Sequence, residues 1–361
     1  MNKNKLLLAI LISMTLAGCG IIQKNEKIKI GAILPLTGNL SQYAQEVQQG
    51  MGLALKNESL PVDILYEDSK SETKPAVDAF YKLSADGASI MITGNSNASL
   101  AISPLANEYA VLQMALFSSA AKYTSPDDFT FQVTPRSEIE NSIMADWVNT
   151  SQAKQIAFIY SQDEWGLGHY DFLHEKINKE KTKISASETY LPADTDFRTQ
   201  LNKIRNTNPE IIFIIAKSKT AGLILKQAKE LKINTQFLGV RAIEGNDLIS
   251  IGGDMAEGII YPYSFNPENT SEQIKQFVDT YKKLYSKIPT AYVAEGYDAT
   301  KLLIGAVKQC GSKNTSCFKQ YLTGIKEYPG VLGSISFDKN GDVYLPIFLK
   351  TVKDGQFVPY K

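Results

Sequence analysis

Residues 28–55, IKIGAILPLTGNLSQYAQEVQQGMGLAL, contain a strand, a turn and a helix in succession, and this pattern recurs along the chain. The first seven residues are mostly apolar, as is typical of a strand buried in a sheet. A turn segment, PLTGN, follows, and Ser41 is expected to cap a helix that carries Val47 and Met51 on its apolar side. The loop between strand and helix leads to Tyr43. Small ligands bind at the carboxyl ends of parallel strands, so Tyr43 is a candidate site residue.

The same alternation of strand and helix continues in two successive series. One uninterrupted apolar run, residues 211–215, is typical of a strand buried on both faces. Two series of this kind predict an α/β protein with two doubly wound parallel-sheet lobes and a cleft between them. Further strands are expected at 62–66, 90–92, 111–117, 156–160, 184–190 and 235–240, and helices at 74–83, 98–109, 139–149, 170–179, 197–205 and 220–231.

Composition limits the classes of function. The 361 residues, 43% of them hydrophobic, are enough for two lobes with separate cores, and the balance of 38 basic and 38 acidic residues argues against nucleic acid as a partner. The sequence contains no Gly-x-Ser-x-Gly, Gly-x-x-x-x-Gly-Lys or His-Glu-x-x-His motif. Its two histidines, His169 and His174, fall on one predicted helix and are expected to face solvent. We therefore predict a chain that is not an enzyme and has no cofactor and no metal site.

The first residues have the composition of an export signal. Two lysines precede an apolar run at 6–16, which is too short for a comfortable membrane span. The run ends in Leu-Ala-Gly-Cys at 16–19, which resembles the bacterial lipobox, whose cysteine is lipidated and becomes the mature amino terminus. Residues 1–18 are thus expected to be a lipoprotein signal peptide, Cys19 the lipidated residue and residues 19–26 a tether to the membrane. The alternative is an ordinary signal peptide with an incidental cysteine, and both place the domain outside the cytoplasm.

Cys310 and Cys317 are separated by a polar turn between helical segments. In an exported chain this spacing predicts a local disulfide. Closing so small a ring adds about 2–3 kcal/mol to the free energy of unfolding by the chain-entropy estimate. The bond is expected to hold a turn and to have no chemical role.

Several short motifs occur in a particular order along the chain. They are IGAILPLTG at 30–38 with Tyr43 and Gly50, the loop at 94–99, Ser118-Ser119, Trp165-Gly166, Gln227-Ala228 before FLG at 237–239, and Phe337-Asp338 with Gly341-Asp342. Their order and spacing resemble the bacterial extracytoplasmic solute-binding proteins of the branched-chain amino acid (Leu/Ile/Val-binding) ABC transporter type. The likeness covers nearly the whole mature chain and depends on the set of motifs rather than on any one of them.

The resemblance implies the type I periplasmic binding protein fold, in which the chain crosses between the lobes three times. The crossings would fall near Pro135, Phe265 and Gly341. Lobe 1 would comprise residues 27–136 plus 266–341, and lobe 2 residues 137–265 plus 342–361. The implied partners are a small-molecule solute and the permease and ATPase subunits of an ABC importer, with the binding protein itself a monomer.

The resemblance also implies which residues contact the solute. Family members hold the ligand's α-carboxylate with hydroxyl and backbone N–H groups of the first lobe, and aromatic side chains close over the ligand. The matching positions here are Tyr43, Ser96, Phe117 through its backbone, Ser119, Trp165 and Tyr292. The alternative role is capping or turn bonding for the serines and core packing for Trp165 and Tyr292.

Two cations depart from the family pattern. Lys217 stands near the position where an aromatic side chain usually follows the strand, and Arg241 stands where amino acid binders place the acid that receives the ligand's ammonium. If both cations face the cleft, the solute carries a negative or strongly hydrogen-bond-accepting group there, because a buried unpaired cation is costly. Alternatively, Arg241 pairs with Glu244 or Asp247 and leaves the cleft neutral. A third possibility is that Glu244 replaces the missing acid in a branched-chain amino acid binder.

These observations predict a lipid-anchored binding subunit of an ABC importer, which captures a small amino-acid-like or carboxylate solute by hinge closure. The competing function on the same fold is that of a ligand-sensing receptor or partner-binding domain. A lone lipid anchor with no transmembrane or signalling segment favours the transporter subunit.

Overall fold

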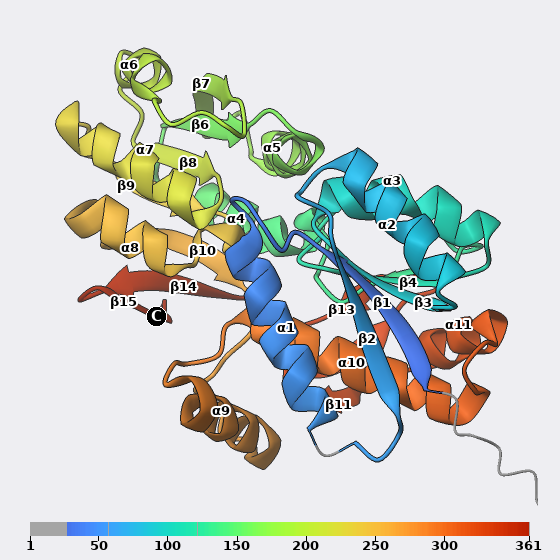
Figure 1. Ribbon diagram of the computed structural model, residues 1–361. Helices are drawn as coiled ribbons and strands as arrows, with labels where there is room; N and C mark the ends of the chain where they lie inside the picture. The colour runs from blue at the N-terminus through green and yellow to red at the C-terminus, as the bar shows by residue number, and fades with distance from the viewer. Residues whose placement is uncertain (1–26, 57, 121, 361) are drawn as a thin grey trace, which may run out of the picture.

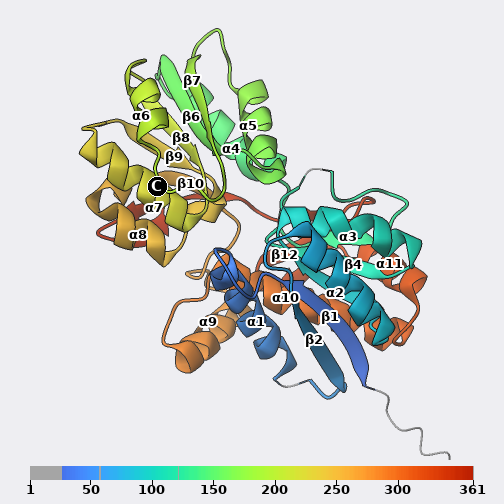
Figure 2. The same cartoon turned by 45° about the horizontal axis from the view of Figure 1, so that its top comes forward.

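The computed structural model describes residues 27–56, 58–120 and 122–360, and it contains two α/β lobes side by side (Figure 1). Each lobe is a sheet covered by helices, and each is assembled from segments far apart in the sequence. Figure 2 shows this by colour, since lobe 1 combines blue and orange segments and lobe 2 combines green, yellow and red ones. This is the two-lobed doubly wound architecture that the sequence predicts. No helix in the described part of the chain is long and apolar enough to cross a membrane.

Lobe 1 contains a five-stranded parallel sheet in the order β2-β1-β3-β4-β5. β1 (Ile28–Leu34) is buried except at Lys29, and its central position brings Ile30 opposite both Ile64 and Ile90. The other strands are β2 (Val62–Asp68), β3 (Ile90–Gly94), β4 (Leu112–Leu116) and β5 (Thr130–Gln132). The helices of this lobe are α1 (Ser41–Leu55), α2 (Thr73–Ala85), α3 (Ser96–Glu108), α9 (Glu272–Tyr285), α10 (Ala291–Cys310) and α11 (Thr315–Thr323).

Helices α1 and α10 pack with their backbones in contact. A Cβ atom at Gly50 would overlap the carbonyl oxygen of Val293, and one at Gly296 would overlap the carbonyl oxygen of Val47. Glycine at both positions is therefore what permits the close approach of the two helices. The same packing brings Tyr43, in the first turn of α1, to 4.8 Å between ring centroids from Tyr292, in the first turn of α10.

Lobe 2 contains a seven-stranded sheet in the order β15-β14-β10-β9-β8-β6-β7. The five strands β10, β9, β8, β6 and β7 pair in parallel, and β8 is buried along its whole length as predicted. The strands are β6 (Gln155–Ser161), β7 (Lys183–Tyr190), β8 (Ile211–Ile215), β9 (Gln236–Gly239), β10 (Ile260–Tyr263), β14 (Phe348–Lys353) and β15 (Gln356–Pro359). The helices are α4 (Ser137–Thr150), α5 (Glu164–Lys176), α6 (Arg198–Arg205), α7 (Ser218–Glu230) and α8 (Asn246–Gly252), with short 3-10 helices η1 (Arg241–Ile243) and η2 (Gly253–Ala256).

The sheet of lobe 2 is not wholly parallel. β14 pairs antiparallel with β10, and β15 pairs antiparallel with β14. The turn of this hairpin is Asp354-Gly355, and both residues have positive φ, 53° and 68°, as a type I′ turn requires. An Asp-Gly pair between two short apolar runs is a hairpin signal, so this edge was readable in the sequence although the prediction omitted it.

Three segments connect the lobes, after β5, after β10 and near the C-terminus. Before the last of them the chain forms a small sheet with lobe 1, made of β11 (Tyr328–Gly330), β12 (Gly333–Phe337) and β13 (Val343–Tyr344). The Asp342 carboxylate accepts hydrogen bonds from Thr124 and Gln132 of lobe 1, both at 2.6 Å. These bonds hold the chain on lobe 1 past Gly341, so the third connection lies between β13 and β14.

Three predicted helix starts differ from the observed ones. The Ser41 hydroxyl donates to the carbonyl of Gly38 (2.8 Å), so it does not cap α1. Asn95 caps α3 by accepting from Ala98, which places Ser96 in the first helical turn rather than in a loop. Asp163 likewise caps α5, so Trp165 lies in the first turn of that helix.

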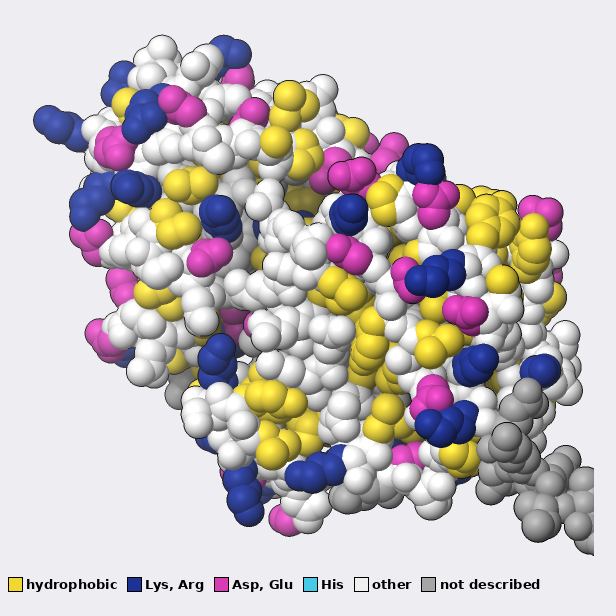
Figure 3. Space-filling view, in the orientation of Figure 1, with side chains coloured by type: hydrophobic (Ala, Val, Ile, Leu, Met, Phe, Trp, Pro, Cys, Tyr) yellow, Lys and Arg dark blue, Asp and Glu magenta, His cyan; other side chains and the backbone are white. Residues whose placement is uncertain are grey.

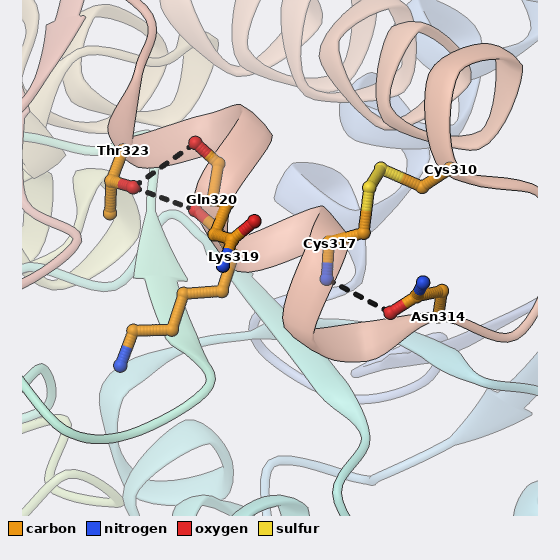
Figure 4. The surroundings of a disulfide bond; sticks show 6 residues. All are labelled: Cys310, Asn314, Cys317, Lys319, Gln320 and Thr323. Atoms are coloured by element: carbon orange, nitrogen blue, oxygen red, sulfur yellow. Dashed lines mark hydrogen bonds between the residues drawn. A yellow bond between two sulfur atoms is a disulfide. The ribbon is translucent and has the colours of Figure 1, made fainter.

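Cys310 at the end of α10 and Cys317 in the first turn of α11 form a disulfide, with their Cα atoms 5.7 Å apart (Figure 4). Asn314 caps α11 by accepting a hydrogen bond from the backbone N–H of Cys317 (3.1 Å). The bond joins two helices of lobe 1 on the side away from lobe 2 (Figure 1). It has no contact with the residues between the lobes.

Candidate functional site

A small cavity lies between the lobes, at the point where the carboxyl ends of strands from both sheets face each other. In the space-filling view the surface is hollowed where the lobes meet (Figure 3). The cavity is lined by Leu40, Tyr43, Phe117, Ser119, Glu140, Trp165, His169, Lys217, Arg241, Ala242 and Tyr292. All the predicted ligand-contact residues except Ser96 therefore line one cavity, although they are spread over the two lobes. The prediction that Phe117 contacts the solute through its backbone is not met, because its N–H donates a hydrogen bond to Glu295.

Aromatic rings form the lobe 1 wall of the cavity. The ring centroid of Tyr43 lies 4.8 Å from that of Tyr292 and 6.4 Å from that of Phe117. Phe117 follows β4 with a φ of 37°, and its ring packs over Gly94, where a Cβ atom would collide with it. This wall offers apolar surface of the kind that holds the body of a small ligand.

Tyr43 also joins the two lobes. Its hydroxyl accepts a hydrogen bond from the backbone N–H of Ser218 (3.2 Å) and donates one to the carbonyl of Ala242 (3.3 Å). Tyr43 belongs to lobe 1 and its two partners belong to lobe 2, so these bonds form only when the lobes are together. The structure is therefore a closed form.

Arg241 lies between two glutamates, one from each lobe. Its Nε is 2.6 Å from Oε1 of Glu140, which is on α4 of the same lobe, and its guanidinium is 2.7 Å from Oε1 of Glu295 on α10 of lobe 1. Glu295 also accepts hydrogen bonds from the Phe117 N–H and the Thr134 hydroxyl, both at 2.9 Å. All three charged side chains are buried. Arg241 is thus a charged link across the cleft.

The prediction that Arg241 is an unpaired cation in the cleft is wrong. Its predicted local partners are also not the ones observed, because Glu244 pairs with Lys350 (2.9 Å) and lines a separate groove. The observed partners lie on helices that are remote in the sequence, and they reach Arg241 only through the fold of lobe 2 and the closure of the lobes. A substitute role for Glu244 at the cavity has no support in this arrangement.

Burial changes the protonation of the charged groups. It raises the pKa of Glu140 to about 7, an effect that the attraction of Arg241 offsets only in part. It also lowers the pKa of the Lys217 amine to about 7. For Arg241 burial disfavours the charge, but Glu140 and Glu295 outweigh burial and raise the pKa of the guanidinium. Near neutral pH, Arg241 therefore stays charged, while Glu140 and Lys217 can each gain or lose a proton.

Lys217 follows β8 and reaches over the ring of Trp165, with Nζ 3.4 Å from the ring centroid. This is a cation–π contact within lobe 2. Both side chains line the cavity and also the wider cleft outside it. Among the residues that the structure describes, no carboxylate forms an ion pair with Lys217. Its amine is thus a group that an anionic ligand can pair with, and such a ligand favours its protonated form.

The prediction that His169 faces solvent is wrong, because its side chain is only 1% exposed and lines the cavity. Its Nε2 is 3.3 Å from the hydroxyl of Ser119 in lobe 1, and its Nδ1 is 2.7 Å from Nδ2 of Asn141 on α4. Its ring meets that of Trp165 edge to face at 4.9 Å. Burial, followed by the nearby charges of Lys217 and Arg241, lowers the pKa of His169 well below its ordinary value, so the ring is neutral at pH 7.

Ser96 lies just outside the cavity, in the wider cleft between the lobes. Asn95 beside it has a φ of 60°, is 7% exposed, and has a side-chain Nδ2 without a hydrogen-bond partner among the described residues. Both residues are at the N-terminus of α3, where the first backbone N–H groups and the helix dipole favour an anion. The predicted polar loop is therefore an anion-favouring end of lobe 1, next to the inner cavity.

Glu140, Glu295 and His169 were not predicted as functional residues from the sequence. Each lies on a helix at a spacing that places it on the buried face: Trp165 and His169 are four residues apart on α5, and Glu140 precedes the buried Met144 by the same interval. A charged residue on an apolar helical face was the available signal. In the described ranges no group of three or more His, Cys, Asp or Glu side chains is placed to hold a metal ion.

The two lobes, the enclosed cavity and the bonds across it define a binding protein that closes over a small ligand. A family model for periplasmic binding proteins matches residues 27–356, so the chain belongs to that family of non-enzymatic solute-binding proteins. Within the family it is a type I periplasmic binding protein of the branched-chain amino acid ABC transporter type. Proteins of this family are extracytoplasmic.

Two comparisons support this assignment, and a third shows the fold alone. Leu/Ile/Val-binding protein homolog 1 of Brucella suis is 25% identical over 332 residues, which is 88% of each chain. The leucine binding protein LivK of Thermotoga maritima is similar in structure, with a TM-score of 0.86, 26% identity, and coverage of 92% of this chain and 98% of that one. A solute-binding protein of an ABC transporter from Rhodopseudomonas palustris BisB5, in complex with 3,4-dihydroxybenzoic acid, has a TM-score of 0.84 at 22% identity, covering 92% and 95%.

Proposed function

We propose that this chain is the solute-binding subunit of an ABC importer and that its solute is a small organic anion with one carboxylate and an apolar body. The observation that carries the proposal is Lys217, a cation that lines the cavity, stacks on Trp165 and has no carboxylate partner within the described chain. Arg241, which already binds two glutamates, is not available as the primary anion contact.

The charges around the cavity favour an anion at Lys217. A cation enclosed by closing lobes loses its hydration, which costs free energy. A carboxylate beside it offsets this cost through a charge-assisted hydrogen bond. Ser119 and the N-terminal end of α3 lie on the opposite lobe and offer further hydrogen-bond donors to the same anion. The rings of Tyr43, Phe117 and Tyr292 would cover the apolar body of the solute.

Capture occurs by closure of the lobes on the solute. The ligand is held by lobe 1 and lobe 2 at once, so its contacts stabilise the closed form relative to the open one. Closure also forms the bonds of Tyr43 with Ser218 and Ala242 and the ion pair between Arg241 and Glu295. The protein therefore contributes part of the closing free energy, and the solute supplies the rest.

The membrane attachment of the protein and its transporter partners are proposed from the sequence. Cys19, which lies outside the described residues, would carry the lipid that attaches a monomeric binding protein to a bacterial membrane. A permease and an ATPase would complete the importer. A sensory role on the same fold is the competing function, and loss of solute uptake in cells that lack this chain distinguishes import from sensing.

A zwitterionic amino acid is the second candidate solute, because Glu140 lines the cavity and is an acid that would receive an ammonium group. The relatives named as a leucine binding protein and as a Leu/Ile/Val-binding protein homolog also favour this class. Against it, Arg241 lies 2.6 Å from the same carboxylate and repels an ammonium there. Burial also leaves Glu140 only partly ionised at neutral pH, since its pKa is about 7.

A thermal-shift panel tests the proposal. The mature protein without its first 26 residues is heated with aliphatic carboxylates, aromatic carboxylates, dicarboxylates and the branched-chain amino acids. A solute at 100 times its dissociation constant adds about 2.7 kcal/mol to the free energy of unfolding, which is a clear shift in melting temperature. Stabilisation by carboxylates that lack an ammonium group supports the proposal. Stabilisation by leucine, isoleucine or valine alone contradicts it and favours the second candidate.

A further inference from the structure

We propose that His169 fixes the orientation of the Ser119 hydroxyl and thereby makes Ser119 a hydrogen-bond donor to the solute. This inference rests on the proposed function for the identity of the solute, but its first test needs no solute. It assigns a specificity role to a histidine that lies on α5, one turn from the Trp165 that lines the same cavity.

The tautomer of His169 follows from its neighbour Asn141. The side-chain nitrogen of Asn141, which can only donate, is 2.7 Å from Nδ1 of His169. Nδ1 must then be the unprotonated, accepting nitrogen, and in a neutral imidazole the proton is on Nε2. Asn141 and His169 both belong to lobe 2, on α4 and α5, so this tautomer is set before the lobes close.

The tautomer determines what Ser119 can do. Nε2–H of His169 points at the Ser119 oxygen, 3.3 Å away, so this oxygen is the acceptor of the pair. The hydroxyl hydrogen of Ser119 must then point elsewhere, and the side chain lines the cavity. A solute oxygen at this place gains a hydrogen bond, whereas an ammonium or N–H group meets another donor. Since Ser119 is in lobe 1, this selection operates only when the lobes are closed.

The first experiment reads the tautomer by two-bond ¹H–¹⁵N correlation NMR on histidine-labelled protein without solute. The chain contains two histidines, and His174→Gln removes the signals of the other one. The expected spectrum has a protonated Nε2 and an unprotonated Nδ1 for His169. A proton on Nδ1 would mean that Asn141 presents its oxygen to the ring and that Ser119 donates to the histidine, which overturns the proposal.

The second experiment measures discrimination by calorimetry. The probes are the carboxylate that stabilises the protein most in the thermal-shift panel and the amine with the same carbon skeleton. His169→Phe keeps a flat ring but frees the Ser119 hydroxyl, so the preference for the carboxylate over the amine is expected to fall about tenfold. The matched control is His174→Phe, a half-buried position on the same helix outside the cavity, which is expected to keep the wild-type preference.

An unchanged preference in His169→Phe would also overturn the proposal. The two proposals fail in different ways. If no carboxylate binds at all, the proposed function fails while the tautomer remains as read by NMR. If carboxylates bind but the tautomer is reversed, the solute class stands and the role of His169 does not.

Discussion

Replacing Glu295 by glutamine should shift the protein toward its open form. The change keeps the size of the side chain, and the glutamine oxygen can still accept from Phe117 and Thr134. It removes the charge that lies 2.7 Å from the Arg241 guanidinium across the lobes. A hydrogen bond to a charged group contributes about 1.5–3 kcal/mol. This bond exists only in the closed form, so the equilibrium constant for closure should fall about 10- to 100-fold.

Small-angle X-ray scattering measures this shift directly. The protein itself contributes part of the closing free energy, so the radius of gyration of Glu295→Gln without solute should exceed that of the wild type, and saturating solute should restore the compact value. Calorimetry should show weaker solute binding by about the same factor as the loss in closure, because the solute must then supply the missing closing free energy.

The matched control is Glu140→Gln. It also removes a carboxylate from Arg241, at 2.6 Å, but both of these residues belong to lobe 2. Its main effect should be on the stability of lobe 2, with little change in the radius of gyration. Equal opening in the two variants, or no opening in Glu295→Gln, would refute the view that the Arg241–Glu295 pair links the lobes.

Three further results are expected. A carboxylate solute favours the charged form of Lys217 and the protonated form of Glu140, whose pKa values are both about 7. Because two protons are then coupled to binding, its dissociation constant should rise by up to about 30-fold between pH 7 and 8 and stay nearly level below pH 6; a flat calorimetric profile would contradict this. Reduction of the bond between Cys310 and Cys317 should lower the free energy of unfolding in urea by about 2–3 kcal/mol and leave solute affinity unchanged. A loss of affinity on reduction would contradict the view that the disulfide has no role in solute binding. Cys19→Ala should leave unprocessed precursor, whereas the wild type should partition into detergent; an unmodified Cys19 peptide in mass spectra of the wild type would rule out the anchor.

The fold was predictable because local patterns repeat. Apolar runs such as 28–34 and 211–215, with helices of similar length between them, specify buried parallel strands whatever the rest of the chain does. The antiparallel hairpin at the C-terminus has no such repeat, and its Asp354-Gly355 turn was the one available signal. The predicted starts of α3 and α5 were a few residues too late, because Asn95 and Asp163 cap these helices earlier than the apolar pattern indicates.

The site was predictable only in part, because its charges are arranged by tertiary structure. Tyr43, Phe117 and Trp165 follow strands, and strand ends converge in this fold, so their meeting could be foreseen. The partners of Arg241 could not be read from local spacing: Glu140 is on another helix of lobe 2, and Glu295 arrives from lobe 1. Local acids such as Glu244 were the natural expectation, yet Glu244 is held by Lys350 in a different groove.

Paired titrations of wild type and Lys217→Met test the central claim most directly. Leucine, isoleucine, valine and a set of aromatic, aliphatic and dicarboxylic acids are titrated by calorimetry in buffers with different ionisation enthalpies. We expect a carboxylate without an ammonium group to bind the wild type with uptake of protons at pH 7.5, and to lose at least about tenfold in affinity in Lys217→Met, since that variant removes its charged partner. Tight binding of a zwitterionic branched-chain amino acid, undiminished in Lys217→Met, would contradict the claim that the closed cleft selects a small organic anion.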